Sequence, residues 1–239
     1  MNNWKKVLGV GVAIGLLLVL VQYVFRFDTK IFQTTVLLLC IALFVIISLT
    51  KTLSTSHFRK RVQKELALME AGKPEEALQD MEALAEELDQ KKNQHQAALC
   101  RLNMTAAYRE MKRYDKALEV LESLSGEKFE GLEDVVYRLN LCICNFYLGD
   151  NEKGLSIYQE NEKLFDEYDH HKRYGVYITL AMLFATVAAG ELDKAEQRLE
   201  RAKAVYCDAR YEEDFRMVED RLTAARANAL PEQTEESAE

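Results

Sequence analysis

Three stretches of the sequence repeat an arginine, an apolar residue and a side-chain amide. The three tripeptides are Arg61-Val62-Gln63, Arg101-Leu102-Asn103 and Arg138-Leu139-Asn140. Each amide lies 14 positions before a small residue, and these small residues are Ala77, Ala117 and Gly154. A side-chain amide both donates and accepts hydrogen bonds, so it can bind a peptide backbone with little demand on the peptide's sequence. The spacing therefore places a side-chain amide at the same position in three repeated segments.

The residue types that usually carry out catalysis or bind metals are scattered along the chain. The histidines are His57, His95, His170 and His171, and no metal-binding His or Cys spacing, phosphate loop or nucleophile elbow is present. The pair His170-His171 has two interpretations: a surface metal site, or a polar turn between two helices. Cys142 and Cys144 point to different sides if they lie on one helix, so they do not share a metal. We expect no enzyme, no cofactor and no bound metal.

The charge balance argues against one class of partner. The chain of 239 residues has a formal net charge of −8; its first 50 residues contribute +3, which leaves −11 for residues 51–239. Nucleic acid requires a basic surface, so we expect no nucleic-acid partner. A local basic cluster is formed by Arg59, Lys60, Arg61 and Lys64. This cluster either contacts anionic lipid or only marks the cytoplasmic side of a membrane.

The elements that must position the amides follow from an internal repeat. The segments 72–78, 112–118, 149–155 and 190–196 align without gaps, and each combines a turn, an acidic helix start and a small residue. These small residues, Ala77, Ala117, Gly154 and Ala195, are 40, 37 and 41 positions apart. A small residue is expected where two helices touch. The repeat therefore predicts an all-α fold of about four antiparallel helix pairs.

This arrangement resembles the tetratricopeptide repeat (TPR), a helix-turn-helix unit with a glycine before its turn and an aromatic residue in each helix. The matching residues are Gly72, Gly149 and Gly190 before the turns and Tyr108 and Tyr158 at the aromatic positions. Two features depart from the family: the spacing exceeds about 34 residues, and Glu65 and Thr105 stand where glycine or alanine is expected. The resemblance covers roughly residues 57–207 and implies a stacked superhelix with a concave groove.

The resemblance also implies that the repeated amides face this groove and that nearby apolar side chains accept those of a ligand. The predicted partner-binding residues are Arg61, Gln63, Arg101, Asn103, Arg138, Asn140, Ile143, Phe146, Tyr177 and Phe184. The alternative is that the polar residues are solvated or join neighbouring repeats and that the aromatic residues belong to the core. The groove interpretation predicts that Asn103→Ala combined with Asn140→Ala weakens partner capture and leaves thermal unfolding nearly unchanged.

Both ends of the repeat region have distinct patterns. Tyr211, Phe215, Val218 and Leu222 lie on one helical face after Asp208, which predicts a C-terminal capping helix for a solenoid over residues 57–230. Residues 231–239 are rich in glutamate and lack an apolar stripe, so we expect a disordered acidic tail.

Two apolar runs without a charged residue, 7–25 and 31–49, precede the repeats. A helix of 19 residues extends about 28 Å, close to the roughly 30 Å hydrocarbon thickness of a bilayer. We therefore expect a transmembrane hairpin in residues 1–50 and a linker in residues 51–56. The linker lacks glycine and proline, so the alternative is one helix that continues through it. The distribution of lysine and arginine predicts a cell-membrane protein with both termini and the solenoid in the cytoplasm.

Together these features predict a membrane-anchored adaptor or scaffold that binds protein or peptide partners through the concave face. The first alternative is a structural membrane protein that associates with itself as a homo-oligomer, and a second is an enzyme with an unrecognised site. A monomeric soluble fragment that captures foreign proteins would favour the adaptor. Concentration-dependent oligomers without another ligand would favour self-assembly.

Overall fold

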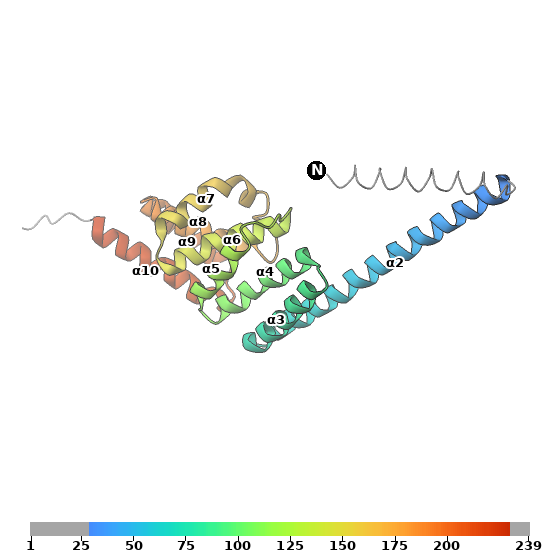
Figure 1. Ribbon diagram of the computed structural model, residues 1–239. Helices are drawn as coiled ribbons and strands as arrows, with labels where there is room; N and C mark the ends of the chain where they lie inside the picture. Colours follow the sequence, from blue (N-terminus) through green and yellow to red (C-terminus); the bar gives the residue numbers. More distant parts are fainter. Residues whose placement is uncertain (1–28, 230–239) are drawn as a thin grey trace, which may run out of the picture. The chain divides into compact units, whose positions relative to one another are not determined.

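The computed structural model describes residues 29–229, and this range is helical without a strand. Its elements are α2 (Thr29–Glu70), α3 (Pro74–Gln90), α4 (Gln94–Glu110), α5 (Tyr114–Ser123), α6 (Leu132–Leu148), α7 (Asn151–Asp166), α8 (Gly175–Ala188), α9 (Leu192–Val205), the 3₁₀ turn η1 (Ala209–Tyr211) and α10 (Glu212–Ala229). From α3 onward each helix packs against the next one along the chain (Figure 1). The prediction of an all-α helical array is therefore confirmed.

The chain divides into two compact units, residues 1–61 and residues 62–239. The described part of the first unit consists of α2 residues, whose large apolar side chains between Leu37 and Leu49 are mostly exposed. Residues 51–56 are helical, so of the two alternatives for this segment the continuous helix is the one observed. Their sequence contains no residue that interrupts a helix, which is the physical reason that α2 continues through them. The C-terminal turns of α2 belong to the second unit.

The predicted membrane topology and localisation are corrected by the structure. The run 7–25 lies outside the described residues, and the run 31–49 lies within α2. Over residues 29–229, no helix combines the length and the apolar character that crossing a bilayer requires. The apolar run forms only part of a 42-residue helix whose other half is polar and charged. Within the basic cluster proposed to contact lipid, Lys64 pairs with Asp80 of α3 at 2.5 Å.

The turns of the repeat share one backbone geometry. Their first residues have positive φ angles of 72°, 57°, 87° and 77° at Gly72, Lys112, Gly149 and Gly190, respectively. The next backbone N–H then donates to a carbonyl five residues earlier, as from Lys73 to Leu68 at 3.0 Å. This hydrogen bond satisfies a carbonyl that the end of the helix would leave without a partner. The four segments that align without gaps in the sequence therefore also share one turn conformation.

The small residues of the repeat lie where helices touch. Ala77, Ala117 and Ala195 are fully buried, and Gly154 is buried against the ring of Phe146. The core of the second unit consists of two clusters, one formed mainly by α3, α4 and α5 and the other by α6 to α10. Residues of α6 pack into both clusters, so this helix joins the two halves of the unit.

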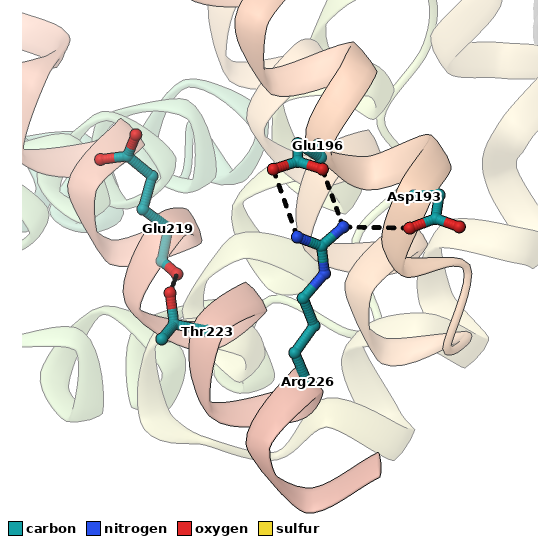
Figure 2. A network of polar contacts seen from close by, with 5 residues as sticks. All are labelled: Asp193, Glu196, Glu219, Thr223 and Arg226. Atoms are coloured by element: carbon teal, nitrogen blue, oxygen red, sulfur yellow. Dashed lines mark hydrogen bonds and ion pairs between the residues drawn. The ribbon is translucent and has the colours of Figure 1, made fainter. Parts of the chain in front are cut away.

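α10 covers the C-terminal end of the array, as the sequence predicts for a capping helix. Its Phe215, Val218 and Leu222 are buried against α8 and α9. Arg226 of α10 donates to Glu196 of α9 at 2.8 and 3.2 Å and to Asp193 at 3.0 Å, and Figure 2 shows its guanidinium between the two carboxylates. These charges lie at the surface, so the buried apolar face contributes more to docking than the ion pairs do. The predicted acidic tail, 231–239, lies outside the described residues.

Candidate functional site: a groove between helices

The second unit contains a cavity of about 450 Å³ that we call the inner groove. Helices α2, α3, α4, α6 and α8 line it together with η1 and the segment between α7 and α8. Its apolar lining is Leu66, Met69, Met81, Leu102, Ala106, Val136, Leu139, Tyr174, Tyr177 and Tyr211, and its polar lining is Glu70, Asn103, Arg109, Glu110, Asn140, Lys172, Arg173 and Arg210. A concave surface with apolar walls and a few convergent polar groups is the usual form of a ligand site.

A short chain of hydrogen bonds holds the polar floor of the groove. Arg109 Nη1 of α4 donates to Asn140 Oδ1 of α6 at 2.7 Å. Asn140 Nδ2 donates to Thr105 Oγ1 at 3.1 Å, and this hydroxyl donates to the carbonyl of Leu102 at 2.6 Å. Thr105, which departs from the TPR pattern, therefore gives Asn140 an acceptor that glycine or alanine would lack. The network joins α4 to α6 beneath the groove.

Arg109 is the charged centre of this floor. Its guanidinium carbon lies 4.5 Å from the centroid of the Tyr177 ring, a distance at which a cation is attracted to an aromatic face. Its two described contacts, with Asn140 and Tyr177, are both with neutral groups. Among residues 29–229, the buried Nε finds no hydrogen-bond acceptor. Within residues 29–229 no carboxylate forms an ion pair with this buried positive charge, although the Asp214 carboxyl interacts with it electrostatically.

A smaller cavity of about 260 Å³ shares Arg109 and Tyr177 with the inner groove and is rich in tyrosine. The rings of Tyr114 and Tyr147 stack with their centroids 4.4 Å apart, and the Tyr147 hydroxyl donates to Asp214. Burial raises the pKa of the Asp214 carboxyl, while the bond from Tyr147 and the charge of Arg109 act in the opposite direction. Burial also raises the pKa of Tyr114 to about 12. These shifts favour neutral hydroxyl and carboxyl groups in this cavity.

Three of the predicted binding residues line the inner groove. Asn103 is half-buried, Asn140 is buried and Tyr177 is half-buried under Arg109. Asn140 already uses both ends of its amide within the fold, so Asn103 is the amide of the repeat that remains half-exposed in the groove. Whether these residues contact a partner remains a prediction.

The other predicted residues do not belong to the groove lining. Ile143, Phe146 and Phe184 are at most 1% exposed, so the prediction that they accept ligand side chains is wrong. They lie on faces that neighbouring helices cover. Arg101 pairs with Asp89, and Arg138 donates to Asp134 at 2.8 Å within α6. Gln63 is exposed outside the groove lining, and Arg61 is a half-buried residue of the first unit.

The sequence interpretation missed all of the charged lining. Ala106 and Arg109 could have been found, because Ala106 lies three residues after Asn103 and Arg109 lies three residues after Ala106, a spacing that makes side chains neighbours on a helix. Lys172, Arg173 and Arg210 lie outside the α-helices, where helical periodicity assigns no face. The tertiary packing of the helices places these residues at the groove, and helical periodicity does not predict that packing.

Cys142 and Cys144 lie in the core, and His170 lies in an exposed turn. Cys142 packs into the C-terminal cluster and Cys144 into the N-terminal cluster, so the prediction that they point to different sides of a helix is confirmed. Burial raises the pKa of the Cys144 thiol to about 11. His170 lies 2.5 Å from Asp169 in the turn after α7. Within residues 29–229, no group of three or more His, Cys, Asp or Glu side chains is placed to hold a metal.

No protein-family model, curated protein or solved structure matches the chain.

Proposed function

We propose that this chain is a protein-interaction module that binds a peptide segment of a partner in the inner groove. In this proposal the helix pairs are TPR-like repeats, and the module acts as an adaptor or scaffold. The observation that carries the proposal is the inner groove itself, a cavity of about 450 Å³ to which five helices contribute side chains. Its size and mixed lining suit a few residues of a peptide.

The half-buried amide of Asn103 is the proposed contact with the peptide backbone. It lies between the apolar side chains of Leu102 and Ala106 on the groove side of α4. An amide there can donate to a peptide carbonyl and accept from a peptide N–H, and the apolar walls remove water from both hydrogen bonds. We propose binding and not catalysis, because the polar groups of the floor are committed to holding α4 and α6 together.

A photo-crosslinking amino acid at position 103 of the full chain tests this proposal in living cells. We expect it to trap partner proteins that mass spectrometry identifies. The matched control carries the same amino acid at position 63, where Gln63 belongs to the same repeated column but lies outside the groove lining. Equal capture at both positions, or capture of only the chain itself at position 103, would contradict binding in the groove.

A substitution test complements the crosslinking. We expect Asn103→Ala to weaken partner capture with little change in thermal unfolding, because none of the hydrogen bonds that hold α4 to α6 uses the Asn103 side chain. Asn140→Ala is not suitable for the same test. Its side chain is 5% exposed and holds Arg109 and Thr105, so its removal changes the fold as well as the groove.

Self-association is the second candidate function, and a separate observation favours it. Along α2, large apolar side chains such as Leu38, Phe44 and Ile46 are 57–73% exposed. Extended apolar patches of this kind commonly mark interaction surfaces. A dependence of oligomeric state on these residues would favour this function for the first unit, independently of the groove in the second.

A further inference from the structure

The charge of the inner groove is opposite to that of the chain as a whole. Four cationic side chains line it, Arg109, Lys172, Arg173 and Arg210, against the two carboxylates of Glu70 and Glu110. The complete chain has a net charge of −8. From this contrast we infer that the groove selects an acidic peptide of a partner protein, with apolar residues between its carboxylates. This inference rests on the proposed function and names the class of partner.

The cations differ in how far the fold already neutralises them. Arg210 donates to Asp208 at 2.8 and 3.1 Å, so this pair adds little net charge. Arg173 lies 3.9 Å from Glu70, and both side chains are largely exposed, so water and salt weaken their attraction. Lys172 has no described partner within residues 29–229, and Arg109 contacts only neutral groups there. Lys172 and Arg173 are therefore the cations available to a ligand, and Arg109 adds a buried positive charge that the nearby Asp214 carboxyl partly offsets.

These cations share the groove with apolar side chains that remain partly accessible. Leu66 and Met69 of α2 and Val136 of α6 are half-buried there without being enclosed in the core. A purely acidic segment would leave this apolar surface in contact with water. A peptide that carries leucine-like residues between glutamates or aspartates covers the apolar surface and brings its carboxylates to the cations. Charge then sets selectivity and the rate of encounter, and apolar burial adds affinity.

The glutamates that follow α10 in the same chain are a poorer fit than a partner peptide. α10 begins directly after the groove residues Arg210 and Tyr211, and its 18 residues extend about 27 Å away from them. Glu232, Glu235 and Glu236 lie within seven residues of Ala229. Seven residues span at most about 25 Å, so among the glutamates after α10 only Glu239, ten residues beyond Ala229, could span the length of the helix, and only with the chain fully extended. We therefore assign the groove to a separate protein.

The test measures binding of a synthetic peptide to the full chain by fluorescence anisotropy. The probe is a labelled twelve-residue peptide with the order Gly-Leu-Glu-Glu-Leu-Glu-Glu-Leu-Glu-Glu-Leu-Gly, and the matched probe replaces every glutamate by glutamine. We expect the glutamate probe to bind at least about tenfold more tightly and to lose affinity with rising salt. The variant Lys172→Glu/Arg173→Glu should remove this preference. The control Lys91→Glu/Lys92→Glu makes the same charge change outside the groove lining and should retain it.

Three outcomes would overturn the inference. Equal binding of both probes would show that charge does not select the ligand, while the proposed groove function stands. Loss of the preference in both double variants would show that it arises from the overall charge and not from the groove. Tighter probe binding after deletion of residues 230–239, together with binding of that segment as a free peptide, would assign the groove to the chain's own tail. If neither probe binds and crosslinking from position 103 traps no partner, the proposed function itself fails.

Discussion

Asn140 occupies a predicted ligand position but serves the fold. It accepts from Arg109 and donates to Thr105 in a buried setting between α4 and α6. We expect Asn140→Ala to lower the free energy of unfolding by about 2 kcal/mol, because it removes two hydrogen bonds and leaves a buried guanidinium N–H without its acceptor. Urea denaturation measures this change. Asn103→Ala is the control, and we expect it to stay within about 0.5 kcal/mol of the wild type; equal losses for the two variants would contradict this assignment.

Gly154 is needed at its helical position because of a neighbouring ring. A Cβ atom at this residue would lie 2.8 Å from two ring carbons of Phe146, which is itself fully buried. Gly154→Ala would improve intrinsic helix propensity by up to about 1 kcal/mol, but the overlap forces a packed ring to move. We expect a net destabilisation of about 1–2 kcal/mol in urea denaturation.

A double-mutant cycle separates this clash from a general intolerance of α7. In the background Phe146→Leu, which removes the ring, Gly154→Ala should cost less than it does in the wild type. An equal cost in both backgrounds would place the origin of the effect elsewhere in the helix.

Asp214 introduces a dependence of stability on pH. Burial raises its pKa in the folded chain above the ordinary value of 3.8. Well below pH 3.8 the carboxyl is protonated in both states; as pH rises, the unfolded chain gives up its proton first, and the folded chain does so only at its higher pKa. The stability of the wild type relative to Asp214→Asn should therefore fall as pH rises from about 3.5 towards neutrality. Urea denaturation of both proteins across this range measures the difference, and a constant or rising difference would contradict the shift.

Individual residues show where sequence interpretation reached its limit. The repeat spacing correctly placed Ala77, Ala117 and Gly154 at buried helix contacts. It did not distinguish the half-buried Asn103 from the core residue Phe146, because periodicity identifies a face of a helix but not the neighbour that covers it. Packing of non-adjacent helices decides that question.

At the scale of elements, the turn before each second helix was predictable because the backbone needs a left-handed residue there. Glycine supplies it in three of the four aligned turns, and Lys112 adopts φ 57° in the other. Lys92 adopts the same conformation, with φ 58°, in the turn from α3 to α4. For α2 the sequence left two alternatives, a linker or a continuous helix, because an apolar run and a polar helix can follow each other without any residue that interrupts the backbone.

Lys92 gives a direct test of this backbone cost. A side chain with a Cβ atom is strained at φ 58°, so we expect Lys92→Gly to raise the free energy of unfolding by roughly 1 kcal/mol. Lys112→Gly should gain less, because Lys112 also pairs with Glu213 of α10 at 2.5 Å. Thermal or urea unfolding compares the two variants. Destabilisation by Lys92→Gly would mean that the lysine side chain contributes a contact larger than the strain.

At the scale of the whole molecule, the second unit is continuous because α6 contributes to both core clusters. Val135, Leu139 and Ile143 pack into the C-terminal cluster, while Val136 and Cys144 pack into the N-terminal cluster. In repeat arrays each pair is stabilised mainly by its neighbours. The last turns of α2 fill this role for α3, because Leu68 and Met69 pack against the N-terminal cluster. The second unit therefore needs residues from about 62 onward to complete its core.

A pair of fragments tests this division of the chain. We expect residues 57–229 to unfold cooperatively and to remain monomeric in sedimentation equilibrium, because this range contains both core clusters and lacks the exposed apolar side chains from Leu37 to Leu49. A fragment that begins at residue 74 lacks Leu68 and Met69, so it exposes the apolar face of α3 and should lose several kcal/mol of stability. If the fragment 57–229 forms concentration-dependent oligomers, self-association belongs to the helical array itself, and the exposed face of α2 does not account for it.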